Sequence, residues 1–183
     1  MTFKMMDIVD LEKTRFELKV RKGYRNWVSQ FGENFESSTR LSHLSNKTLI
    51  SLAQGRGNNS FYLYDLIMNL QDLGSGFEFN DLASKDKMLV MDRYIFLLDR
   101  IRFEYMKRLG WFDSYPGEEF TLVELIIKFD SLAPGMQAKP PVLSMDHPAY
   151  RKFCKMNLFE KEELIRKLVP KALKEIQDHS TTL

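Results

Sequence analysis

The sequence has a single cysteine, Cys154, among its 183 residues, and this excludes a disulfide bond within the chain. It also has no long apolar run, because its longest strongly apolar stretches span only four residues, whereas a membrane-spanning helix needs about 20. The first residues lack the apolar stretch of a secretory signal peptide. Together these absences predict a cytoplasmic protein with a reduced thiol and no membrane contact.

The two charge signs are nearly balanced, because the chain has 27 basic and 25 acidic residues and a net charge of +2. This balance gives no bulk attraction to nucleic acid or to a membrane surface. Residues 49–66 have a helix-turn-helix-like spacing, but their second helix would carry no Lys or Arg to contact phosphates. Nucleic acid is therefore not an expected partner.

The residue patterns of metal and nucleophile chemistry are also missing. The histidines at 43, 147 and 179 lie far apart, and no His-x-x-x-His or Cys-x-x-Cys pair occurs. On a helix, His147 and Cys154 would lie about 10 Å apart, whereas a general base lies within about 3 Å of its nucleophile. No catalytic residue, metal or cofactor is predicted, although an enzyme site assembled from scattered residues stays open.

Apolar side chains are plentiful, at 44% of the residues, and they include 14 Phe. A chain of this length can bury roughly 70% of the surface that its unfolded form exposes. The composition therefore excludes disorder, and we expect residues 1–183 to form one helical domain.

Helical spacing of the apolar residues predicts an all-α bundle of about six or seven helices. Capping residues and glycines place the first five at residues 8–32, 45–54, 60–73, 84–109 and 121–133. Phe16, Leu18 and Val20 also alternate as a half-buried strand would. An α+β fold with a short N-terminal strand at 15–21 is therefore the alternative.

The end of the chain differs in composition from the rest. Four of the six prolines fall within residues 134–148, which predicts an extended segment. A C-terminal helical arm at 149–178 is expected to follow, and Pro170 should kink or split its last helix.

The fourth predicted helix is apolar on two sides and forms the centre of the predicted bundle. Opposite its broad core face, Leu89, Phe96 and Phe103 repeat every seven residues beside Arg93 and Arg100. A helix of this kind either has neighbours on both sides or carries a partner surface. Aromatic residues and Arg are enriched in protein interfaces, so these five residues are the candidate partner interface.

Arg102 falls within the apolar core face of the same helix. An unpaired buried charge is very costly, so a charge at this position must be matched by hydrogen bonds and an acid. We therefore predict that Arg102 is partly buried and paired, with Asp99 or with an acid from another helix.

A second candidate site is the loop before the third predicted helix, formed by Arg56, Gly57, Asn58, Asn59 and Ser60. The glycines allow a close backbone approach, and the helix start and Arg56 could hold a phosphate-like anion. The spacing matches neither a Walker A motif nor a dinucleotide fingerprint, and the same residue types form ordinary turns.

From these patterns we expect a non-catalytic helical module that docks a protein partner or associates with itself as a homo-oligomer. The alternative is a protein that binds a small ligand, such as a phosphate or a nucleotide, at the loop of residues 56–60.

Overall fold

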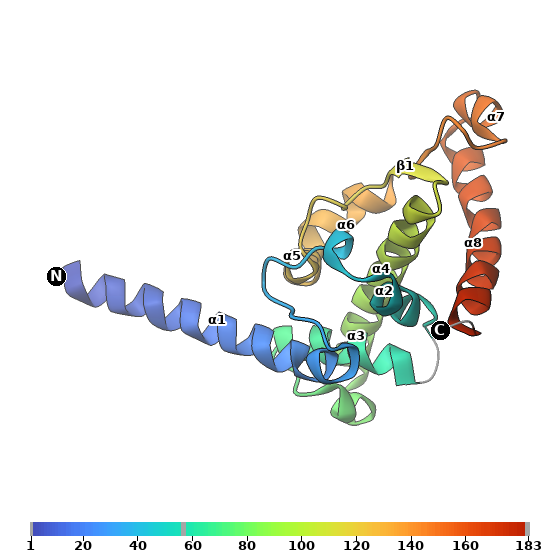
Figure 1. Cartoon of the computed structure of the whole chain (residues 1–183). Helices are drawn as coiled ribbons and strands as arrows, with labels where there is room; N and C mark the ends of the chain where they lie inside the picture. Colours follow the sequence, from blue (N-terminus) through green and yellow to red (C-terminus); the bar gives the residue numbers. More distant parts are fainter. Residues whose placement is uncertain (1, 56–57, 182–183) are drawn as a thin grey trace.

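The computed structural model describes residues 2–55 and 58–181, and side chains within 10–55 and 59–178 (Figure 1). About 70% of the chain is helical, and the only strands in these ranges form one small two-stranded sheet. The all-α prediction is confirmed. The alternative strand at 15–21 is not formed, because those residues lie within helix α1 (Thr2–Phe31).

The remaining helices are α2 (Asn46–Ala53), α3 (Asn58–Leu70), α4 (Ser84–Arg108), α5 (Leu122–Ile127), α6 (Phe129–Gln137), α7 (Tyr150–Cys154) and α8 (Leu158–Thr181). Two short 3₁₀ turns, η1 (Leu41–His43) and η2 (Gly76–Asp81), precede α2 and α4. Strands β1 (Phe112–Ser114) and β2 (Val142–Leu143) pair antiparallel.

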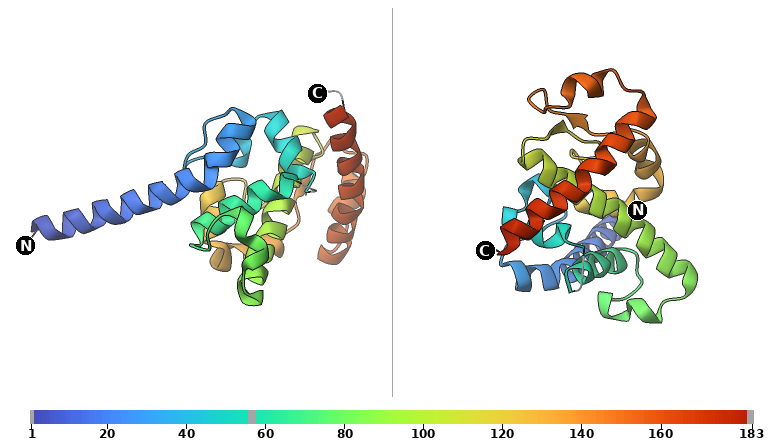
Figure 2. Two further views of the ribbon diagram at one scale, coloured as in Figure 1. Left: turned by 90° about the horizontal axis from the view of Figure 1, so that it is seen from below. Right: turned by 90° about the vertical axis from the view of Figure 1, so that its right-hand side faces the viewer.

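Helix α4 is the centre of the bundle. It contacts α2, α3, α5, α8 and β1, and α8 crosses it in the right-hand view of Figure 2. Its core face buries Val90, Leu97, Ile101 and Met106 completely. The prediction of a central helix at 84–109 is therefore confirmed.

Local sequence signals account for several helix ends. The hydroxyl of Thr121 accepts the Glu124 N–H at 3.0 Å, and the Glu124 carboxylate accepts the Thr121 N–H at 2.9 Å, which completes the predicted capping box. The Ser45 hydroxyl likewise accepts the Thr48 N–H at the start of α2.

The glycine inside the first helix permits close packing. Gly23 lies where α3 crosses α1, and a Cβ there would come within 2.9 Å of Leu66 Cδ1.

The helix predicted to end near residue 133 differs from the structure. The backbone breaks at Lys128, and α6 then continues through Pro134 to Gln137. Burial of Ala133 and Met136 holds these turns together although Pro134 cannot donate a backbone hydrogen bond. The extended segment predicted at 134–148 therefore begins only after α6.

Candidate functional site

The structure places the predicted interface stripe inside the protein. The Phe96 ring meets Phe129 of α6 edge-on, with 5.4 Å between ring centroids, and Phe103 meets Phe112 of β1 in the same way at 5.8 Å. The Arg100 guanidinium lies over both stripe rings, 5.1 Å from the Phe96 centroid and 4.9 Å from that of Phe103. These three side chains are buried by their own chain.

Arg93 and Leu89 complete the same covered face. The Arg93 guanidinium lies 4.7 Å from the Phe129 ring centroid and donates to the Leu89 carbonyl and to Asp130. Arg93 is buried and Leu89 is half-buried against the core. The interpretation of these residues as a partner interface is thus replaced by central burial, because α5, α6 and β1 occupy the space.

Three members of the predicted anion site lie outside the described residues, namely Arg56, Gly57 and the side chain of Asn58. The Asn59 amide donates to Gln54 at 2.8 Å and accepts from Ser51 at 3.2 Å, which ties the start of α3 to the end of α2. Ser60 is half-buried in the first turns of α3. Anion binding at this loop stays a prediction.

Arg102 is half-buried, as predicted from its position on the helix. Its Nε–H donates to the Ala53 carbonyl, 3.2 Å away at the end of α2. Burial raises the pKa of the Asp99 carboxyl, and the positive charges of Arg100 and Arg102 partly offset this rise. Arg102 therefore fastens α4 to α2 through a backbone acceptor and interacts with Asp99 electrostatically.

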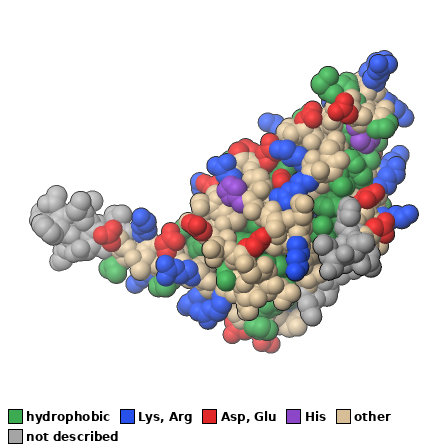
Figure 3. Space-filling view, in the orientation of Figure 1, with side chains coloured by type: hydrophobic (Ala, Val, Ile, Leu, Met, Phe, Trp, Pro, Cys, Tyr) green, Lys and Arg blue, Asp and Glu red, His purple; other side chains and the backbone are tan. Residues whose placement is uncertain are grey.

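The N-terminal half of α1 projects from the body of the molecule (Figures 1 and 2). Every side chain from 10 to 15 is exposed, and burial begins only at Phe16. Leu11 and Leu18 keep 59% and 49% of their surface exposed. Figure 3 shows acidic, basic and hydrophobic side chains alternating along this exposed helix.

One outer face of α1 combines apolar and basic groups. At 100° per residue, a single narrow arc holds the set that we call the arm face, Leu11, Arg15, Leu18, Lys22 and Arg25. All five are exposed. Sequence reasoning missed this face, although the seven-residue spacing of its two leucines is the signal that also marked the stripe of α4.

An aromatic groove lies beside the other end of α1, with a cavity volume of about 530 Å³. Its lining consists of Asn26, Ser29, Gln30, Phe61, Tyr62, Gly76 and Phe77. Phe77 is 77% exposed and contacts Phe61 at 4.5 Å between ring centroids. Glu78 and Asp81 are exposed nearby in sequence, Asp72 pairs with Lys19 of α1 at 2.7 Å, and residues 58–84 contain no Lys or Arg.

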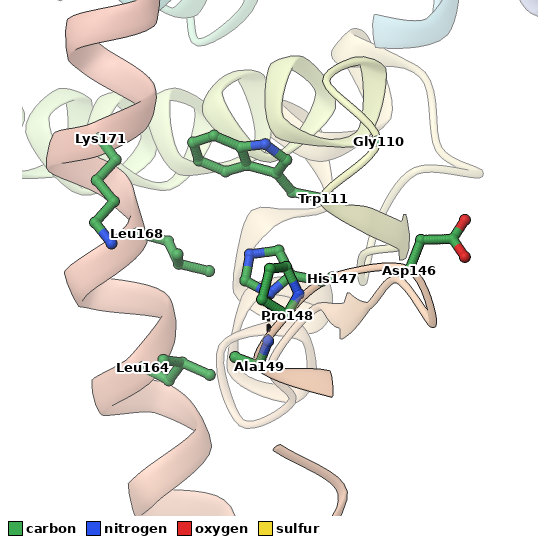
Figure 4. A pocket seen from close by; sticks show the side chains of 9 residues that line it. All are labelled: Gly110, Trp111, Asp146, His147, Pro148, Ala149, Leu164, Leu168 and Lys171. Atoms are coloured by element: carbon green, nitrogen blue, oxygen red, sulfur yellow. Dashed lines mark hydrogen bonds between the residues drawn. The ribbon is translucent and has the colours of Figure 1, made fainter. Parts of the chain in front are cut away.

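A second cavity, of about 480 Å³, separates α8 from the end of α4 and from the turn before α7 (Figure 4). Its lining residues are Gly110, Trp111, Asp146, His147, Pro148, Ala149, Leu164, Leu168 and Lys171. Gly110 has a φ of 83°, which favours glycine and lets the chain turn so that Trp111 faces α8. We call this cavity the His147 pocket.

Backbone hydrogen bonds position His147 in this pocket. The Ser144 N–H donates to the Trp111 carbonyl at 2.8 Å, and the His147 N–H donates to the Ser144 carbonyl at 3.0 Å. The Ala149 N–H donates to His147 Nδ1 at 3.1 Å, so in the neutral imidazole the proton lies on Nε2. In Figure 4 this second nitrogen points away from Ala149, toward the space between Trp111 and α8.

The electrostatics of the pocket are set by one lysine and one histidine. Burial and, to a smaller extent, the positive charge of Lys171 lower the pKa of His147. The imidazole is therefore neutral near pH 7. The Asp146 carboxylate points away from the other lining side chains in Figure 4, which leaves the Lys171 ammonium as the charge at the cavity.

Within the described ranges, no group of three or more His, Cys, Asp or Glu side chains could hold a metal ion. In the same ranges, no helix combines the length and the apolar content needed to cross a membrane. Comparison of the chain with protein-family models, with curated proteins and with solved structures found no match.

Proposed function

We propose that the chain is a non-catalytic helical self-association module, in which α1 of one copy docks against a second copy. The observation that carries this proposal is the projection of α1, whose side chains from 10 to 15 are all exposed. Helical segments without tertiary contacts are marginally stable in water. A partner surface along the arm face would stabilise this half of the helix.

The chain itself offers a surface that complements the arm face. The arm face places Leu11 and Leu18 among basic side chains, and the aromatic groove places Phe61 and Phe77 in a segment that carries only acidic charges. Apolar groups would meet apolar groups, and Arg or Lys would meet Asp or Glu. Complementary potentials of this kind favour specific association.

Docking would be reciprocal in a dimer. The arm face begins at Leu11 in the projecting half of α1, whereas Asn26, Ser29 and Gln30 of the groove lie near the C-terminal end of the helix. Two copies related by a two-fold axis across α1 would each place an arm on the groove of the other. Such an isologous contact closes on itself and gives a dimer rather than a filament.

Nucleic acid and anionic lipid fit the arm less well than a protein surface does. Asp10 and Glu12 are exposed within about one and a half turns of Arg15, and phosphate groups would be repelled by these carboxylates. A protein surface can match both signs. The free thiol of Cys154 is exposed, which suits the reducing cytoplasm expected from the sequence.

The oligomeric state of the full chain in solution tests the proposal. We expect sedimentation velocity to show a concentration-dependent dimer for the wild type. Leu11→Glu with Leu18→Glu should shift the population to monomer, and Phe77→Glu should do the same from the other side of the contact. Added salt should weaken the dimer, because exposed ion pairs are screened.

Leu158→Glu is the matched control, since Leu158 is an exposed leucine on α8, away from both surfaces. It should leave the dimer unchanged. A wild-type chain that stays monomeric up to about 100 μM, a concentration at which even weak dimers with micromolar Kd form, would overturn the proposal. A dimer that resists all arm and groove variants would overturn it as well.

A further inference from the structure

We infer that the His147 pocket is a binding site for a carboxylate carried by a compact apolar group. This inference is independent of self-association, because the pocket lies against α8 and not against α1. Its volume of about 480 Å³ is within the range of small-ligand sites. Such sites combine mostly apolar walls with a few polar groups that orient the ligand.

The walls of the pocket are apolar on both sides. Leu164 and Leu168 project from α8 into the cavity, and the ring of Trp111 faces them from the end of α4 (Figure 4). Pro148 and Ala149 form the floor on the side of the turn. An aromatic or branched aliphatic group would bury its surface between these two walls. One wall is carried by α8, and the other by the end of α4 and the turn before α7.

Two donors are placed to receive an anionic group. In the neutral imidazole, His147 Nδ1 accepts the Ala149 N–H. The proton therefore lies on Nε2, which is a hydrogen-bond donor and not an acceptor. Lys171 extends from α8 at the same cavity and supplies the positive charge. A carboxylate needs one positive charge and few donors, and the lining offers the Lys171 ammonium and the His147 N–H.

A carboxylate fits this set better than a phosphate does. A phosphate carries a charge near −2 and would need further donors, whereas the lining contains one cation and one neutral imidazole. The Asp146 carboxylate points away from the cavity, so it does not repel a singly charged ligand at close range. The same chemistry is found in a free organic acid and at the C-terminus of a peptide that ends in an apolar residue.

Calorimetric titration of the full chain tests the inference with defined probes. 3-Phenylpropanoate represents the free acid, and 3-phenylpropan-1-ol is its uncharged counterpart. A tripeptide that ends in Phe is compared with its C-terminal amide to represent the peptide source. We expect a Kd on the order of 1 mM or tighter for the acid probes, as ligands of this size allow, and at least about tenfold weaker binding of the alcohol and the amide.

Lys171→Met should weaken the acid probes at least about tenfold while the apolar stem is kept. Lys167→Met is the matched control, because Lys167 is exposed one turn earlier on α8 and does not line the pocket. His147→Leu should also weaken the acids, with circular dichroism confirming that the variant is folded. Stronger binding of the tripeptide would assign the peptide source, and stronger binding of 3-phenylpropanoate would assign the free acid.

Three results would overturn the inference. The first is that neither acid probe gives binding heat in the titration or changes the NMR chemical shifts of the residues that line the pocket. The second is equal binding of the acid and the alcohol, since the pocket would then be apolar only. The third is an equal effect of the Lys171 and Lys167 variants.

Discussion

Helices α1 and α4 are the two long helices of the N-terminal two thirds of the chain, and both carry apolar residues on two sides. In α4 the second apolar side is covered by α5, α6 and β1, and even Arg93 and Arg100 are buried there. In α1 the second side, with Leu11 and Leu18, is left in solvent. The same sequence pattern therefore has opposite outcomes, depending on whether later segments return to the helix.

The largest expected difference between the two helices is in their tolerance of a charge. Phe96→Asp should unfold the protein or cost more than about 4 kcal/mol of unfolding free energy, because it removes a fully buried ring and adds an unpaired carboxylate. Leu11→Asp should change the stability of the monomer, measured at a protein concentration below that of dimer formation, by less than about 0.5 kcal/mol. Urea unfolding followed by circular dichroism measures both. A folded, cooperatively melting Phe96→Asp variant would show that α4 is not central.

The charged groups of α4 should also differ from those of α1. Buried Glu104 accepts hydrogen bonds from the Tyr115 hydroxyl at 2.8 Å and from Arg108 at 3.1 Å. Tyr115→Phe should cost about 1.5–3 kcal/mol, because hydrogen bonds to charged groups are worth about that much and the carboxylate stays buried. Arg15→Met on α1 should be nearly neutral. Equal effects in urea unfolding would contradict the contrast.

A smaller effect is expected where α4 meets α2. Arg102→Met should cost about 1 kcal/mol, because it removes the donor to the Ala53 carbonyl while an apolar stem still fills the space. Lys22→Met on α1 is the control, since Lys22 is exposed. Thermal unfolding at equal pH compares the two variants. A change near zero at Arg102 would mean that its guanidinium is effectively solvated.

The smallest effect concerns His147, which lies in the turn before α7 and lines the pocket against α8. Burial and Lys171 lower the pKa of His147, so between about pH 6.5 and the lowered value the unfolded chain binds the proton more readily than the folded chain does. Stability should therefore fall as the pH is lowered through this window. The difference between the wild type and His147→Gln isolates this contribution from those of the carboxyl groups. A pH-independent difference would contradict the burial of this imidazole.

The helices could be predicted from the sequence because their signals are local. The Thr121–Glu124 capping box, the Ser45 cap and the apolar spacing of α4 depend on residues within a few turns of one another. The end of α6 could not be predicted, because Pro134 argues locally for a stop while burial of Met136 by distant residues extends the helix. Burial of Ala133 and Met136 in this turn offsets the backbone hydrogen bond that Pro134 cannot make.

Neither candidate site could be read directly from the chain. The His147 pocket joins Trp111, His147 and Lys171, which are separated by more than twenty residues and meet only because β1 pairs with β2 and α8 folds back. The arm face has a local pattern, but the same pattern in α4 predicts an interface that the structure fills with its own chain. Exposure is a property of the packing and not of the helix.

The sequence by itself determined the fold class, the central helix, most helix starts and the half-buried state of Arg102. These follow from periodicity and capping, whose energies act within one element. The tertiary structure alone decided which apolar stripe is covered, where the pocket opens and which half of α1 projects. Covering a stripe requires that segments far apart in sequence arrive at the same place, and hydrophobic burial, which drives this arrival, is non-directional and carries no local mark in the residues that it joins.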